Sequence, residues 1–427
     1  MRNKWKYCKL KNICKITMGQ SPPSETYNLE KLGIPFFQGR KDFGFKYPKV
    51  TMWCKKPQRI AEPNSVLISV RAPVGDINIT REKCCIGRGL AAINGQNNEF
   101  IYYLMKFNEK KLKSIFENEG TVFGCITKEG LNEFEVYIPE DKITQQRIAS
   151  ILSAFDDKIE LNNRMNKTLE VIAQAIFKHW FIDFEFPSDI QNLPSSITEE
   201  DWNNPSFIQK IKSILKSPGY KSSGGKMVKS ELGLIPEGWE IRKLKDIIIK
   251  NRKKIKDKNK WKNLKVIDLS VMPNFSIVIN NFNNGENFQT NIFELNEYDI
   301  LFGSIRPYFG KAGFSPIKGA VTGTVHSFRP KEKIYFSYIL LTIANKNFID
   351  YAIRYSKGTK MPIIDWNNLV DFIITLPQNK KIIFHFEIIV KSLIDKIKEN
   401  ILQNQTLSQL RDSLLPRLMS GKIRLQI

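Results

Sequence analysis

The strongest constraint in this sequence of 427 residues is a long heptad pattern over residues 145–180. Ten positions, spaced alternately four and three residues apart, form the seam of a coiled-coil helix. Eight of the ten are apolar, and the two in the middle are asparagines. The seam comprises Ile148, Leu152, Phe155, Ile159, Asn162, Asn166, Leu169, Ala173, Ile176 and Trp180. Residues 145–180 are therefore predicted to form one long helix.

The same seam recurs 238 residues later, with two asparagines at the same places. It comprises Phe386, Val390, Leu393, Ile397, Asn400, Asn404, Leu407, Arg411, Leu414 and Leu418. A buried asparagine weakens a seam but fixes its register, because a misaligned amide would face carbon without a partner. Antiparallel pairing with asparagine opposite asparagine predicts these facing pairs: Asn162 with Asn404, Asn166 with Asn400, Ile148 with Leu418, Leu152 with Leu414, and Trp180 with Phe386. Two unrelated helices, each packing on its own domain, are the alternative.

The repeat extends beyond the helices. Residues 5–10, 64–75 and 120–139 are echoed by residues 239–244, 298–310 and 358–377. The chain is thus one unit of about 235 residues written twice, which favours pseudo-two-fold symmetry. Within each unit, short apolar runs at 66–70 and 300–302 predict strands, and residues 99–116 and 336–355 have the apolar spacing of helices.

We therefore expect an α/β (α+β) fold with two pseudo-symmetric globular domains joined by two long helices that form an antiparallel coiled coil. Pro139 and Pro377 end the strands that precede the helices. A stretch rich in proline, serine and glycine separates the first helix from the second globule, with a short helix expected at 206–215. The expected segments are a first domain at 1–140, a helical region at 141–184, a connector at 185–230, a second domain at 231–377 and a second helical region at 378–427.

The net charge of +23 indicates a polyanionic partner. Nucleic acid is favoured over a membrane surface, since no apolar run approaches the roughly 18 residues of a spanning helix and the basic residues follow no amphipathic face. From residue 250 to 265, nine of sixteen residues are Lys or Arg, which favours phosphate contact over a solvated loop. All six cysteines lie in the first 125 residues without C-x-x-C spacing, so we expect reduced thiols in the cytoplasm and no metal site.

The motifs of nucleic-acid enzymes are missing from the sequence. The strings nearest to the Asn/Asp-Pro-Pro-Tyr/Phe tetrad of adenine methyltransferases, at 21–24 and 204–207, lack its amide, its aromatic residue or its middle proline. No glycine-rich phosphate loop is present. The acidic pair Asp156 and Asp157 is expected on the solvated face of the first long helix. The sequence favours a chain that binds and positions; a self-sufficient DNA methyltransferase or nuclease with an unrecognised active site is the alternative, and a basic scaffold is a third.

With this layout, the chain resembles the specificity subunit of a type I DNA restriction–modification enzyme over essentially its whole length. The resemblance rests on QQRIASIL at 145–152, DKIEL at 157–161, FIDF at 181–184, SELGLIPEGW at 230–239 and the TMGQSP loop at 17–22. It also rests, in each domain, on a strand followed by Arg and Gly, and on Gly-Thr before the final strand. One departure is Gln378-Asn-Lys-Lys in place of the first repeat's Gln-Gln-Arg, so a different start of the second helix is expected.

The resemblance implies a non-catalytic subunit that binds a bipartite site in double-stranded DNA, one half per recognition domain. It implies two modification subunits that bind S-adenosylmethionine and methylate adenine N6. It also implies restriction subunits that use ATP and Mg²⁺. No cofactor is expected on this chain. The long helices would serve as a ruler, since 36 residues extend about 54 Å, or roughly 16 base pairs.

The loops that follow the matched strands are expected to contact DNA. Arg71 and Arg306 lead, because a guanidinium can bind guanine or phosphate through two hydrogen bonds. A salt bridge that holds the loop is the alternative for each, and phosphate contact is as plausible as base reading for the others. The candidate DNA contacts are Arg71, Arg88, Thr121, Arg306, Lys311, Lys357, Thr359, Lys360, Gln20, Ser21, Gln38, Lys253 and Lys254.

Overall fold

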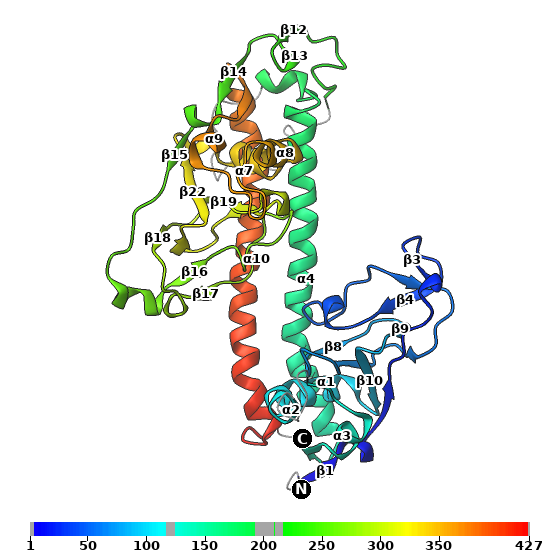
Figure 1. The fold of residues 1–427 in the computed structure, drawn as a ribbon. Helices are drawn as coiled ribbons and strands as arrows, with labels where there is room; N and C mark the ends of the chain where they lie inside the picture. Colours follow the sequence, from blue (N-terminus) through cyan, green and yellow to red (C-terminus); the bar gives the residue numbers. More distant parts are fainter. Residues whose placement is uncertain (1–3, 117–123, 193–208, 210–216, 426–427) are drawn as a thin grey trace. The chain divides into compact units, whose positions relative to one another are not determined.

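The computed structural model describes residues 4–116, 124–192, 209 and 217–425, and the chain divides into two compact units (Figure 1). Unit 1 comprises Met1–Leu161 with Gln403–Ile427, and unit 2 comprises Asn162–Leu402. Thr121 and the helix expected at 206–215 lie outside the described residues, apart from the single position 209.

Unit 1 contains two larger sheets and a two-stranded pair. The pair joins β1 (Trp5–Lys9) to β11 (Glu135–Pro139). An antiparallel sheet has the order β2 (Cys14–Met18), β10 (Leu90–Gly95), β7 (Val66–Ser69), β8 (Ile77–Ile79). A mixed sheet has the order β3 (Tyr27–Asn28), β5 (Trp53–Cys54), β4 (Ile34–Phe37), β9 (Cys84–Ile86), β6 (Ile60–Ala61), with β4 and β9 parallel. Its short helices are α1 (Asn98–Phe107), α2 (Glu109–Phe116) and α3 (Lys128–Glu133).

Unit 2 repeats this topology, except that its mixed sheet has four described strands instead of five. Its pair joins β14 (Trp239–Lys243) to β23 (Ile373–Pro377). The antiparallel sheet has the order β15 (Ile248–Lys250), β22 (Val325–Pro330), β19 (Ile300–Gly303), β20 (Ala312–Phe314). The mixed sheet has the order β17 (Asn283–Asn284), β16 (Lys265–Ile267), β21 (Gly319–Thr322), β18 (Ile292–Leu295), with β16 and β21 parallel. The helices are α7 (Phe336–Ala344), α8 (Lys346–Arg354) and α9 (Trp366–Val370), and a hairpin of β12 (Met227–Ser230) and β13 (Gly233–Pro236) precedes the repeat. The repeat inferred from the sequence is therefore confirmed in the strand order.

Each helix expected at 99–116 and 336–355 is in fact two helices, and asparagines cause both breaks. The Asn108 side chain donates to the Leu104 carbonyl at 2.7 Å, where α1 ends. The Asn345 side chain accepts from the Asn347 amide at 2.9 Å and caps α8. Asparagine competes with the helical backbone for hydrogen bonds, so an apolar period alone missed the breaks.

The two long helices are α4 (Lys142–Phe181) and α10 (Lys380–Met419), each of 40 residues. They begin at equivalent positions of the repeat, so the expectation of a different start for the second helix is wrong. The Asp141 carboxylate accepts the Thr144 amide at 2.8 Å, and the Asn379 side chain accepts the Lys381 amide at 3.0 Å. A capping residue thus stands before each helix even though the next residues differ.

Within each unit the long helices pair antiparallel, side by side (Figure 1). In unit 2 the Asn400 amide donates to Asn166 Oδ1 at 2.8 Å, and the Trp180 and Phe386 rings lie 5.7 Å apart. In unit 1, Ile148 and Leu418 are buried in one hydrophobic core. The contacts of unit 2 confirm the predicted register there, and the shared core of Ile148 and Leu418 in unit 1 agrees with it. Asn162 and Asn404 are both buried.

Buried polar contacts fasten the sheets of unit 1 to its helices. Lys46, whose side chain is 1% exposed, binds Glu99 at 2.6 Å and Asp157 of α4 at 2.9 Å. The Tyr103 hydroxyl donates to Asp156 at 2.7 Å, and Asp156 also pairs with Arg411 of α10. The expectation that Asp156 lies on a solvated face is therefore wrong: its side chain is 2% exposed, because Arg411 and Tyr103 satisfy its charge inside the core.

Unit 2 uses different residues for the same purpose. Glu170 of α4 accepts the Ser276 hydroxyl at 2.7 Å and the Ile277 amide at 2.6 Å. Glu387 of α10 accepts the Ser337 amide at 2.7 Å, in the first turn of α7. Both carboxylates are largely buried, and each satisfies backbone or hydroxyl donors of the globular part.

Candidate nucleic-acid interface

Four of the predicted DNA contacts in unit 1 lie where the loops after β2, β4 and β9 meet. The Gln20 amide donates to the Ile86 carbonyl at 3.0 Å, and the Arg88 amide lies 3.3 Å from Ser21 Oγ. Glycines permit this approach, since a Cβ on Gly19 would lie 2.1 Å from the Gly87 carbonyl oxygen. A Cβ on Gly89 would lie 2.5 Å from the carbonyl oxygen of Gln38, the fourth contact. The structure therefore brings Gln20, Ser21, Gln38 and Arg88 together.

Arg71 lies near these residues because backbone hydrogen bonds hold its neighbour Val70 beside Gly89. It follows β7, where the Val70 amide donates to the Gly89 carbonyl and the Val70 carbonyl accepts the Ile126 amide, both at 2.9 Å. Its side chain is exposed. We name this surface edge 1 and define it by Gln20, Ser21, Gln38, Arg71 and Arg88.

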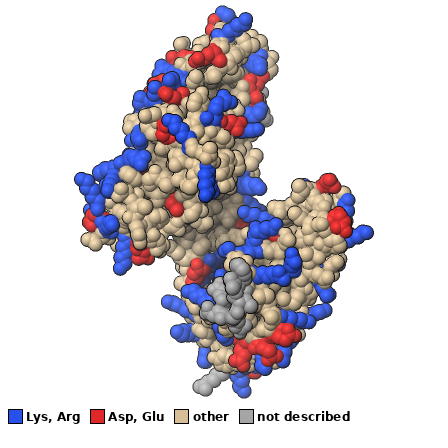
Figure 2. Space-filling view, viewed as in Figure 1, with Lys and Arg blue, Asp and Glu red and all other residues tan. Residues whose placement is uncertain are grey.

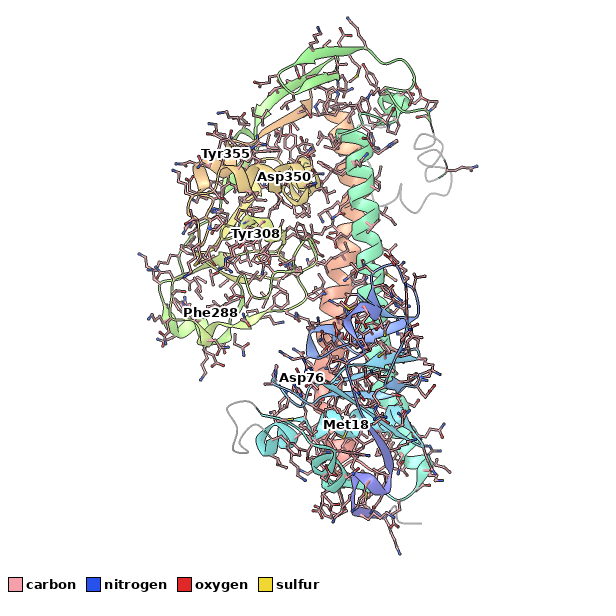
Figure 3. All side chains as sticks on the ribbon, turned by 45° about the vertical axis from the view of Figure 1, so that its right-hand side comes forward. Met18, Asp76, Phe288, Tyr308, Asp350 and Tyr355 are labelled. Atoms are coloured by element: carbon pink, nitrogen blue, oxygen red, sulfur yellow. The ribbon has the colours of Figure 1, made fainter. Side chains whose placement is uncertain are left out.

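Unit 2 has an equivalent surface, edge 2, formed by Arg306, Lys357, Thr359 and Lys360. The Arg306 amide donates to the Pro362 carbonyl at 2.7 Å, and the backbones of Lys357 and Ile363 exchange hydrogen bonds of 2.9 Å. All four edge residues are exposed. Figure 3 shows Tyr308 and Tyr355 on this unit; Tyr308 lies two residues after Arg306 and Tyr355 follows α8.

The backbone of Arg306 is strained. Its φ of +51° lies in the left-handed region, which residues other than glycine seldom adopt. Strain of this kind costs on the order of 1–3 kcal/mol and gathers at binding sites. It turns the chain between β19 and the 3-10 helix Pro307–Phe309, and it leaves the guanidinium on the surface.

Three other predicted contacts of unit 2 lie outside edge 2. The Lys311 ammonium donates to the Leu269 carbonyl, and burial lowers the pKa of Lys311, so this side chain holds a loop in place. Lys253 pairs with Glu294 at 3.0 Å while 75% of its side chain stays exposed, and Lys254 is exposed beside it. Trp261, 5% exposed, anchors the basic run that contains both lysines. Figure 2 shows Lys and Arg side chains gathered along the left-hand border of unit 2.

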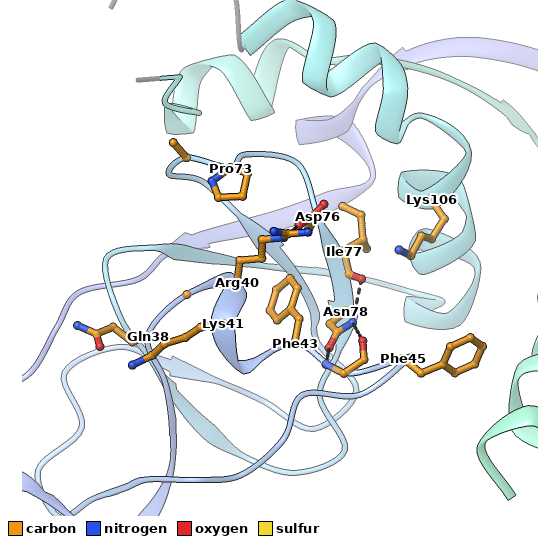
Figure 4. Close-up of a pocket in the computed structure, with 13 residues that line it drawn as sticks. Gln38, Arg40, Lys41, Phe43, Phe45, Pro73, Asp76, Ile77, Asn78 and Lys106 are labelled. Atoms are coloured by element: carbon orange, nitrogen blue, oxygen red, sulfur yellow. Dashed lines mark hydrogen bonds and ion pairs between the residues drawn. The ribbon is translucent and has the colours of Figure 1, made fainter. Parts of the chain in front are cut away.

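A site beside edge 1 was missed at the sequence level. Arg40 and Asp76 form an ion pair in a cavity of about 670 Å³ whose lining includes Gln38, Phe43 and Pro73 (Figure 4). Burial alone would raise the pKa of Asp76, but the hydrogen bond and charge of Lys113 and the charge of Arg40 outweigh it and hold that pKa below its ordinary value. No sequence signal pointed to Arg40, because it follows none of the strands matched between the repeats.

The described part of the chain contains neither a cluster of metal-ligating side chains nor a membrane-spanning helix. There, no three His, Cys, Asp or Glu side chains gather as metal ligands would. Among those same residues, no helix has the length and apolarity needed to cross a bilayer. The six cysteines are free, and burial raises the pKa of Cys84 to about 12 and that of Cys85 to about 11.

Comparison with known proteins agrees with this layout. The family model described as "Type I restriction modification DNA specificity domain" matches residues 2–171 and 236–409. The putative type I restriction enzyme MjaX specificity subunit of Methanocaldococcus jannaschii is 40% identical over 178 residues, 40% of this chain and 41% of that protein. The match thus spans less than half the length of that relative.

Two further matches cover more of the chain. The type I restriction enzyme MjaIX specificity subunit of the same organism is 26% identical over 99% of this chain and 94% of its own. The solved type I restriction–modification S subunit from M. genitalium matches 98% of this chain and 96% of that one with a TM-score of 0.58. At 14% identity this structural likeness concerns the fold alone.

Proposed function

Because the chain belongs to the family of type I restriction–modification DNA specificity domains, we propose that it is the non-catalytic sequence-specificity subunit of such a system. It binds a bipartite site in double-stranded DNA, and each unit reads one half. The observation that carries the proposal is the pair of repeat-equivalent surfaces. Arg71 on edge 1 and Arg306 on edge 2 follow the equivalent strands β7 and β19, and both are exposed.

Electrostatics supports DNA as the ligand. The net charge of +23 supplies a sequence-independent attraction to phosphates, and the exposed lysines at 253, 254, 357 and 360 are placed to contribute to it. Phosphate contacts of this kind set position, whereas the two arginines supply planar donors that distinguish bases. The edges also differ in their remaining side chains, so the two half-sites would differ in sequence.

The partners in this proposal carry the chemistry. Two modification subunits bind S-adenosylmethionine and methylate adenine N6, and restriction subunits that use ATP and Mg²⁺ join them. The chain itself holds no cofactor and works in the cytoplasm. Its contribution is to place the modification subunits at a defined distance from the base pairs that it reads.

The test is methyl transfer by the chain with and without a modification subunit of its own system. The complex is expected to methylate a bipartite site, and the purified chain is expected to transfer no methyl group. Arg71→Ala and Arg306→Ala in the complex should each impair methylation through one half-site only. Methyl transfer or DNA cleavage by the chain alone would overturn the proposal and favour a self-sufficient enzyme.

A further inference from the structure

Arg40 is an exposed arginine whose direction is set by a partly buried carboxylate. Its Nε pairs with Asp76 Oδ2, and 57% of the Arg40 side chain is exposed against 17% of that of Asp76. Figure 4 shows the guanidinium against Asp76 in the cavity, near Phe43 and Pro73. Because the Nε takes the carboxylate, the two terminal nitrogens keep donors for a ligand.

Asp76 is itself immobilised from two directions. Its amide donates to Ser69 Oγ at 2.9 Å, and its Oδ1 accepts Lys113 Nζ at 2.7 Å. Ser69 is fully buried at the end of β7, so the carboxylate is anchored to the antiparallel sheet of unit 1. An arginine held by such a group loses less conformational entropy when it binds than a free one.

The loop that carries Arg40 is also fixed. Arg40 begins the 3-10 helix Arg40–Asp42, and buried Asp42 accepts the amides of Gln38 at 2.7 Å and Gly39 at 3.3 Å. The Arg40 carbonyl accepts the Phe43 amide at 2.9 Å. Both the backbone and the tip of the side chain are therefore positioned before any ligand arrives.

The residues around Arg40 combine continuity with edge 1, positive charge and apolar walls. Gln38 belongs to edge 1 and also lines the cavity, so the cavity continues the surface proposed to meet DNA. Lys41 and Lys106 add positive charge to the lining, and Phe43, Phe45 and Pro73 add apolar walls. By contrast, no hydrogen bond or ion pair within the described residues holds the Arg71 side chain.

We propose that Arg40, positioned by Asp76, reads a guanine in the half-site bound by unit 1. The two terminal nitrogens of the guanidinium donate to guanine O6 and N7, the pair of acceptors that only guanine presents in the major groove. Asp76 is a positioning residue: it touches Arg40 and not the base. This assignment rests on the proposed function, because it names one base contact of the same DNA surface.

The experiment measures DNA binding by the assembled complex of chain and modification subunits, with DNAs that carry each base at every position of the site. Arg40→Ala and Arg40→Lys are expected to reduce discrimination at one G·C pair of one half-site by about 5- to 150-fold, and to leave the other half-site unchanged. Asp76→Asn should reduce discrimination at the same pair without changing the salt dependence of binding. Arg81→Ala is the matched control, since Arg81 is also an exposed, ion-paired arginine of unit 1 but pairs with Glu160 of α4.

Two results would overturn the assignment. An affinity loss in Arg40→Ala that is equal on all sequences, with a salt slope reduced by about 1, would identify a phosphate contact. Unchanged discrimination in both Arg40 variants would show no contact at all. Lys113→Gln distinguishes a structural role of Asp76 from its role in positioning Arg40, because it removes one anchor of Asp76 and leaves the Arg40 ion pair. This variant should have a lower melting temperature but nearly unchanged discrimination between bases. If the complex without substitutions shows no preference for a bipartite DNA sequence, the proposed function fails. If discrimination at every G·C pair of the site survives in both Arg40 variants, only the role of Arg40 is refuted.

Discussion

Replacing Arg411 with alanine is expected to destabilise unit 1 by about 3–5 kcal/mol, the usual cost of leaving one partner of a buried ion pair without its counter-charge. Arg411 is 19% exposed and Asp156 is 2% exposed. The variant would leave the Asp156 carboxylate in the core with the hydroxyl of Tyr103, 2.7 Å away, as its remaining side-chain donor. We expect the lower end of the range because that hydrogen bond survives.

Unit 2 supplies the control. At the positions 238 residues away from Tyr103, Asp156 and Arg411 it carries Leu341, Ile394 and Ala173, all of them buried. The polar triad of unit 1 therefore has an entirely apolar counterpart in unit 2. The triple variant Tyr103→Leu, Asp156→Ile, Arg411→Ala places the apolar residues of unit 2 at the equivalent positions of unit 1. We expect it to recover most of the stability lost in Arg411→Ala, because apolar replacement of a whole buried ion pair is often neutral.

The assay is urea unfolding of the intact chain, followed by circular dichroism, with hydrogen exchange to locate the change. Arg411→Ala should lower the midpoint and speed exchange in α1, in the first half of α4 and in the last half of α10. A loss below about 1 kcal/mol in Arg411→Ala would contradict this expectation. A triple variant as unstable as Arg411→Ala would refute it as well, since packing and not the unpaired charge would then be responsible.

Three further predictions follow from single contacts. Burial raises the pKa of Glu387 to about 7, so its contribution to stability is present below its ordinary pKa of 4.5 and is lost as pH rises through 7. The urea midpoint should therefore fall between about pH 5 and about pH 8, and this fall should shrink in Glu387→Gln. The double variant Asn166→Leu, Asn400→Leu should have a higher melting temperature, because the 2.8 Å hydrogen bond between the two amides leaves the Asn166 Nδ2 buried without a partner. Without the asparagines the helices should also pair in additional registers, which cysteine cross-linking along the helices would detect. Lys253→Ala should weaken binding of the assembled complex equally on all DNA sequences and reduce its salt slope by about 1, whereas a change in sequence preference would rule out a phosphate contact.

The helix register could be predicted from the sequence because the information is local and repeated. Apolar spacing identified both long helices, and the asparagines restricted their alignment to one solution, which the contact between Asn166 and Asn400 confirms. Arg411 interrupts the apolar seam. Its partner could not be inferred, because Asp156 lies one position beside the seam and the pattern alone assigned it to solvent.

The candidate site was less predictable than the fold. The strands that lead to Arg71 and Arg306 were visible as apolar runs, so these residues could be named as DNA contacts, and that role stays a prediction. The ion pair of Arg40 and Asp76 joins two loops on different sheets and has no echo in the second repeat. Such a contact depends on how the sheets of unit 1 pack, and no local pattern encodes it.

We propose that two units of one chain read the two halves of a DNA site for a partner that modifies it. The most direct measurement is genome-wide mapping of N6-methyladenine in cells that carry this chain with its modification subunit, compared with cells whose chain carries Arg71→Ala or Arg306→Ala. We expect one bipartite methylated sequence with an unspecified spacer, and loss or relaxation of a different half in each variant. Methylation at a single uninterrupted sequence, or the same change in both variants, would contradict it.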